Sequence, residues 1–171
     1  GEIEALKHEA NIMKALRRFK RRETLRIAYG DIVTELPFET TALQISYLAD
    51  ALIQAALVAA RSSVVEKYGE PFNKEQQPAK FVVLALGKLG GSELNYSSDV
   101  DLIFLYDKAG TTVHKHPISN HEFFMYLSQQ LFHYLNTKTD MGACYRVDTK
   151  LRPEGKRGPI AIGRDAALRY Y

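Results

Sequence analysis

Two short apolar runs constrain the fold of this chain more than any other feature. Residues 81–86 (FVVLAL) and 99–106 (DVDLIFLY) are too short for typical helices, and continuous runs of this kind are typical of buried strands. Between them, residues 87–98 are rich in glycine and serine and must turn. Residues 143–150 (ACYRVDTK) alternate in polarity, which predicts a third strand. The second half of the chain is therefore expected to contain a small mixed β-sheet.

The first half has a helical pattern instead. Apolar side chains recur at helical spacing through residues 2–29, which predicts a long helix. A second helix is expected to begin at a capping box formed by Thr41 and Gln44 and to end at Gly69 as its C-cap. Residues 70–79 are polar, contain proline and lack periodicity, so we expect a linker there.

A further helix is expected within the second half. Ser119 and Glu122 form a capping box in front of an amphipathic segment, residues 123–136. We therefore predict an α+β fold, in which a helical N-terminal part (1–79) packs on a core (80–171) whose small mixed sheet is flanked by helices. Both ends break off within patterned sequence, so we expect a core truncated at its C-terminus and a chain that is part of a longer protein.

Charge and cysteine content exclude several classes of protein. The net charge of +3 is too small to indicate nucleic acid by itself, and the basic and aromatic residues are not arranged as a strand-tracking groove. Cys144 is the single cysteine, which suits a reducing cytosol, and no apolar run reaches the roughly 18 residues of a membrane span. We expect a cytoplasmic protein without nucleic-acid or membrane partners. The basic segment from Arg17 to Arg26 is either a solvated helix face or a docking surface for an acidic partner.

Asp99 and Asp101 carry the clearest chemical signal. Residues i and i+2 of a strand point to the same face, so both carboxylates should emerge side by side. At the start of a buried strand they would repel each other and be poorly solvated. A divalent cation removes that conflict, and oxygen ligands are those that magnesium prefers. The alternative is structural: Asp99 caps a turn and Asp101 pairs with a lysine.

The turn in front of this pair has the composition of a phosphate site. Gly87, Gly90 and Gly91 permit positive backbone dihedrals and a close backbone approach, while Ser92 adds a hydroxyl and Lys88 a charge. On their own, glycines in such a segment usually serve only to form the turn and do not indicate a phosphate site. Followed by two same-face aspartates between buried strands, a glycine-rich turn favours phosphate chemistry.

Asp148 is the candidate for a third carboxylate. It lies in the third predicted strand, where Arg146, Lys150 and Arg152 would share its face. Three carboxylates could hold two metal ions roughly 4 Å apart, which clamp the attacking and leaving oxygens. A surface ladder of salt bridges is the alternative.

Two long motifs resemble those of a known family. Residues 87–106 (GKLGGSELNYSSDVDLIFLY) and 145–155 (YRVDTKLRPEG) resemble glutamine synthetase adenylyltransferases, which are bifunctional adenylyltransferases and adenylyl-removing enzymes of the polymerase beta-like nucleotidyltransferase superfamily. Residues 16–28 and 48–53 resemble the helices that precede the catalytic core in that family. The resemblance covers nearly the whole chain and implies that residues 80–171 are a nucleotidyltransferase core.

The resemblance also implies a set of site residues. Asp99, Asp101 and Asp148 would be the catalytic residues and would bind two Mg²⁺ ions. Nucleotide and phosphate would be bound by Gly87, Lys88, Gly90, Gly91, Ser92, Lys150, Arg152 and Arg157. In one respect the chain departs from the superfamily, whose first motif has Gly followed by Gly or Ser where this chain has Gly87 and Lys88. How polymerases hold their triphosphate is therefore not carried over.

Family members carry two such domains, one that attaches AMP to a tyrosine of glutamine synthetase and one that removes it by phosphorolysis. The removing domain typically reads as do residues 93–99 (ELNYSSD) and 152–159 (RPEGKRGP) of this chain. The resemblance thus favours the removing half, with the attaching half or a silent nucleotide-binding module as alternatives. The implied partners are glutamine synthetase, ATP or ADP, phosphate and, through the full-length enzyme, a PII-type signalling protein.

Overall fold

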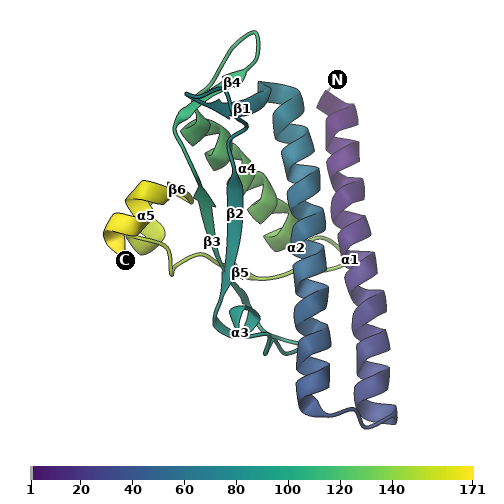
Figure 1. Cartoon of the computed structure of the whole chain (residues 1–171). Helices are drawn as coiled ribbons and strands as arrows, with labels where there is room; N and C mark the ends of the chain where they lie inside the picture. The colour runs from purple at the N-terminus through teal and green to yellow at the C-terminus, as the bar shows by residue number, and fades with distance from the viewer. Residues whose placement is uncertain (1) are drawn as a thin grey trace.

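Two long helices lie along one side of a small sheet in the computed structural model (Figure 1). The structure describes residues 2–171, without the side chains of residues 2–6 and 156. Helix α1 spans Glu2–Val33 and α2 spans Phe38–Tyr68, and the two form an antiparallel hairpin. Helix α4 (Asn120–Asn136) packs against α2 and the sheet. The predicted α+β class is confirmed.

Four strands form the main sheet. Strand β2 (Phe81–Leu86) pairs antiparallel with β3 (Val100–Tyr106). Strands β5 (Val147–Asp148) and β6 (Ala161–Gly163) both pair parallel with β3, β5 at its start and β6 at its end. The sheet is therefore mixed, as predicted.

The remaining elements are short. Strands β1 (Glu70–Asn73) and β4 (Gly110–Val113) form a separate antiparallel ladder. The chain also contains α3 (Gly87–Gly90), the 3₁₀ turn η1 (Gly155–Arg157) and α5 (Arg164–Tyr170).

Arg17 joins the hairpin to the sheet half of the molecule. Its side chain is only 1% exposed, and its guanidinium donates hydrogen bonds to the carbonyl oxygens of Met13, Tyr134, Thr137 and Gly142. Two of these carbonyls belong to the C-terminal end of α4, where helix geometry leaves carbonyls without partners. Apolar side chains of α1, α2, α4 and β3 share one core, so the helical part packs on the sheet half.

The capping signals had mixed outcomes. Ser119 and Glu122 form the predicted capping box at α4, and Gly69 caps α2 by donating its N–H to the carbonyl of Val65. The capping box predicted at Thr41 is wrong, because α2 already begins at Phe38. The Thr41 hydroxyl instead donates to Asp31 of α1.

Three other expectations need correction. Part of the predicted linker is strand β1, which forms only because β4 supplies a partner. Strand β2 is partly buried on one face and exposed on the other, where Val82 is 48% and Leu84 41% exposed. The third strand is limited to two residues, Val147–Asp148.

Helix α2 is long and apolar enough to cross a membrane, by length and composition only. A membrane-spanning helix can contain isolated polar residues. The expectation that no segment is apolar enough to span a membrane, which counted only uninterrupted apolar runs, was therefore too strict. Its buried side chains pack against α1 and α4, as in the core helix of a folded domain. The membrane criterion is therefore weak evidence here.

Candidate functional site

The structure brings the predicted aspartates to one end of the sheet. Asp101 of β3 lies directly opposite Asp148 of β5 in the parallel pair, and Asp99 precedes the first residue of β3. Their neighbours Val100 and Val147 are buried and also lie opposite each other. Because side chains alternate along strands, Asp101 and Asp148 share the outer face of the sheet.

Basic residues hold two of the three carboxylates. Arg146 Nε donates to Asp99 Oδ1 at 2.5 Å, and Lys150 donates to Asp148 through both its Nζ, at 2.7 Å, and its backbone N–H, at 2.8 Å. Both cations are exposed, so these ion pairs contribute little to stability. They do place two cationic side chains directly beside the carboxylates.

Asp101 is in a different position. Burial and the negative charges of Asp148 and Asp99 raise the pKa of its carboxyl, which Lys150 opposes only in part. A carboxylate crowded by like charge favours the binding of a cation. The three oxygen donors thus fit Mg²⁺ in their chemistry. Among the side chains that the structure describes, however, no three of His, Cys, Asp or Glu are grouped closely enough to hold a metal ion as they stand. Metal binding by the three aspartates therefore stays a prediction, and it requires the carboxylates to turn away from their cations.

Gly87 lies with its backbone close to the carboxylate of Asp101. Its backbone has φ +55°, and a Cβ added there would lie 2.5 Å from Asp101 Oδ2. Glycine suits this position for two reasons. Any side chain would crowd the carboxylate, and a residue other than glycine would be strained at this positive φ. Gly90 has a different reason, since its added Cβ would lie 2.6 Å from the carbonyl oxygen of Ala85 in β2.

The expected phosphate cradle is only partly present. Gly91 has φ −86° and its nearest neighbours would be 3.7 Å from an added Cβ, so neither conformation nor space requires glycine there. The N–H groups of Gly91 and Ser92 already donate to the carbonyls of Gly87 and Leu89 within the turn around α3. Of the three glycines that were expected to permit positive dihedrals, only Gly87 adopts one. Lys88 is exposed on α3.

Arg152 does not continue the strand face of Asp148. Its side chain is 9% exposed, and its guanidinium donates to the carbonyl and hydroxyl oxygens of Thr149, both at 2.6 Å, and to the carbonyl of Gly158. The shared face predicted for residues 146–152 is wrong beyond Asp148, because the chain turns there. Arg152 thus holds the loop that follows β5, while Arg157 is exposed on η1.

Sequence reasoning missed the residues that hold the segment in front of Asp99. The Tyr96 hydroxyl donates to Asp31 Oδ2, and the Leu94 N–H donates to Ser46 Oγ, each at 3.0 Å. Asp31 and Ser46 lie in the helical hairpin, about 50 residues or more earlier in the chain. No local signal could have identified them.

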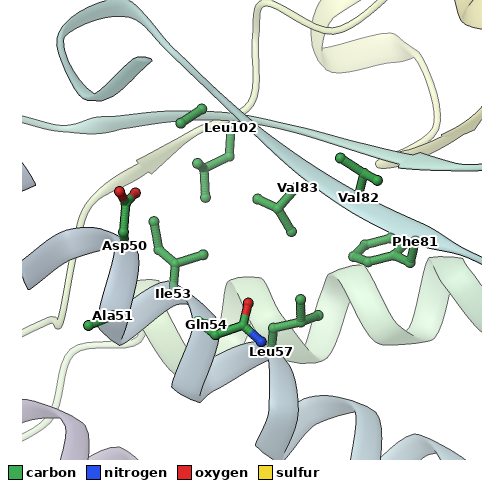
Figure 2. Close-up of a pocket in the computed structure, with 10 residues that line it drawn as sticks. Asp50, Ala51, Ile53, Gln54, Leu57, Phe81, Val82, Val83 and Leu102 are labelled. Carbon is green, nitrogen blue, oxygen red and sulfur yellow. The ribbon is translucent and has the colours of Figure 1, made fainter. Parts of the chain in front are cut away.

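A groove lies between α2 and the edge strand β2 (Figure 2). It measures about 610 Å³, and its lining is largely apolar, with Asp50 and Gln54 contributed by α2. None of the three aspartates lines it. The groove is therefore separate from the candidate site formed by the aspartates.

Comparison with known proteins gives a family for the whole chain. The sequence profile of the family described as glutamate-ammonia ligase adenylyltransferase matches residues 1–171. The bifunctional glutamine synthetase adenylyltransferase/adenylyl-removing enzyme of Thioalkalivibrio sulfidiphilus is 40% identical over 169 residues, which cover 99% of this chain. The chain spans 17% of the length of that relative.

Proposed function

We propose that this chain, which belongs to the glutamate-ammonia ligase adenylyltransferase family, contains a magnesium-dependent centre that removes AMP from adenylylated glutamine synthetase. The observation that carries the proposal is the register of the sheet, in which Asp101 and Asp148 are direct neighbours beside Asp99. The name of the relative includes both attachment and removal. The motifs at residues 93–99 and 152–159 favour removal.

The proposed reaction is a phosphorolysis. An oxygen of inorganic phosphate attacks the phosphorus of the AMP group, and the bond from phosphorus to the tyrosine oxygen breaks. The products are ADP and an unmodified tyrosine, whose oxygen takes up a proton. Phosphate is already anionic near neutral pH, so this direction requires no general base.

Asp99, Asp101 and Asp148 would hold the magnesium, which when bound would neutralise charge on the phosphorus oxygens and on the leaving oxygen. Gly87 leaves the space that the Asp101 carboxylate occupies. Arg146 and Lys150 are exposed, and they are free to turn from the carboxylates to phosphate once a cation is bound.

The remaining ligands and partners follow from the same proposal. Glutamine synthetase is the protein substrate, ADP and phosphate are the small-molecule ligands, and the location is cytoplasmic. Lys88 and Arg157 are the further cations proposed for the phosphate pocket. A PII-type signalling protein is proposed as a partner of the longer enzyme.

A two-way assay tests the direction. The chain is incubated with Mg²⁺ and either phosphate plus adenylylated glutamine synthetase or ATP plus the unmodified enzyme. We expect ADP in the first mixture and no adenylylated product in the second. Adenylylation from ATP would assign the chain to the attaching half. Equal ADP formation by the Asp101→Asn variant would remove the aspartates from the mechanism.

A further inference from the structure

The segment that leads into the candidate site is held mainly from outside the sheet. We call residues 91–99, between α3 and β3, the aspartate loop. In Figure 1 the chain around α3 reaches the lower half of α2. At the far end of the loop, the N–H of Val100 donates to the carbonyl of Arg146, which fixes the start of β3.

The first anchor is a buried hydrogen bond to α2. Ser46 is 1% exposed, and its hydroxyl donates to the carbonyl of Ala42 while accepting the N–H of Leu94, whose side chain is fully buried. The Ser46 hydroxyl hydrogen is thus used in the bond to Ala42, and the hydroxyl oxygen is the acceptor for the loop. Losing this acceptor would leave a buried N–H without its partner, which is costly.

The second anchor is a carboxylate near the end of α1. Asp31 accepts the Tyr96 hydroxyl at one oxygen, at 3.0 Å, and the Thr41 hydroxyl at the other, at 3.2 Å. One side chain therefore links α1, α2 and the loop. Partial burial and the hydrogen bond to Asp31 raise the pKa of Tyr96.

Hydrogen bonds within the loop connect this anchor to the candidate site. Ser98 Oγ donates to Asn95 Oδ1 at 2.5 Å, and the Ser98 N–H donates to the carbonyl of Asn95. Asp99 follows directly. We therefore expect a shift of Tyr96 to displace Asp99 as well.

We propose that Asp31 and Ser46 are positioning residues, which hold the aspartate loop so that Asp99 meets Asp101 and Asp148. The hairpin then acts on the site through Leu94 and Tyr96 without touching the substrate. The proposal rests on the proposed function for its effect on catalysis. The anchoring itself is a property of the chain without metal or substrate.

Tyr96→Phe tests the proposal because it deletes one hydroxyl from a side chain that is 44% exposed. Tyr47→Phe is the matched control, since Tyr47 is an exposed tyrosine of α2, outside the aspartate loop. By hydrogen exchange on the metal-free chain, we expect amides of residues 92–99 to exchange about five- to tenfold faster in Tyr96→Phe than in the control. Equal exchange in the two variants overturns the anchoring.

Kinetics then separate positioning from stability. In phosphorolysis, Tyr96→Phe should lower kcat by about tenfold with little change in KM, while the melting temperature stays within about 2 °C of the control. Asp31→Ala should lower kcat similarly. The double variant Tyr96→Phe/Asp31→Ala should be no slower than the slower single variant, because both substitutions break the same hydrogen bond between Tyr96 and Asp31. A kcat equal to that of the control, or additive losses in the double variant, refutes the positioning role. An unmodified chain that releases no ADP counts against the proposed function, while the exchange result still decides the anchoring.

Discussion

Gly87→Ala is the substitution whose effect follows most directly from the geometry. The new methyl would begin 2.5 Å from Asp101 Oδ2, so the carboxylate must retreat by about 0.9 Å to reach the 3.4 Å of ordinary contact. The positive φ costs about 1 to 2 kcal/mol for an alanine. Because a displacement near 1 Å at reacting groups can lower a rate by about 100-fold, activity should fall far more than stability.

Gly142→Ala is the matched control for this prediction. Gly142 also has a positive φ, +83°, but among the described residues nothing lies within 4 Å of its added Cβ. Urea unfolding should show similar losses for both variants. The rate of ADP formation at saturating phosphate should drop only in Gly87→Ala. If the two variants keep rates within about twofold of each other, Gly87 is not needed to make room for Asp101, and the reasoning is refuted.

The remaining predictions concern stability and the basic residues. Arg17→Ala should lower the free energy of unfolding by about 3 to 5 kcal/mol, because it leaves buried carbonyls unpaired. The control Arg18→Ala, at an exposed position, should change it by less than about 0.5 kcal/mol. Similar urea unfolding curves for the two variants would contradict the role of Arg17. Ser119→Ala should cost about 1 kcal/mol through loss of the α4 capping box, and an unchanged melting temperature would argue against that cap. Arg152→Ala should destabilise the chain by about 1 to 3 kcal/mol, since it frees the loop after β5. Exposed Arg157→Ala should instead raise the KM for phosphate without changing stability, and the reverse pattern would exchange the two assignments.

Features encoded locally could be predicted from the sequence. The runs at residues 81–86 and 99–106 were correctly identified as strands, because short apolar runs bounded by turn residues have few alternatives. The Ser119 capping box was also correct, since its partners lie three residues apart. The alignment of Asp101 with Asp148, in contrast, depends on the parallel pairing of β3 with β5.

Features that depend on distant partners could not be predicted. Strand β1 requires β4, about 40 residues later, so its own polar sequence gave no signal. Composition showed that glycines can adopt positive φ, but only the structure shows that Gly87 does so and that Gly91 does not. The strand of Asp148 ends early because the carboxylate accepts the N–H of Lys150, a turn that competes with the alternating pattern.

We propose that the aspartates around β3 and β5 support phosphorolysis of an AMP-tyrosine bond. Isotopically labelled inorganic phosphate tests this most directly, because its label enters the product only if phosphate is the nucleophile. With Mg²⁺ and adenylylated glutamine synthetase, we expect labelled ADP from the unmodified chain and none from Asp101→Asn. Release of unlabelled AMP, or labelled ADP that persists in Asp101→Asn, would contradict it.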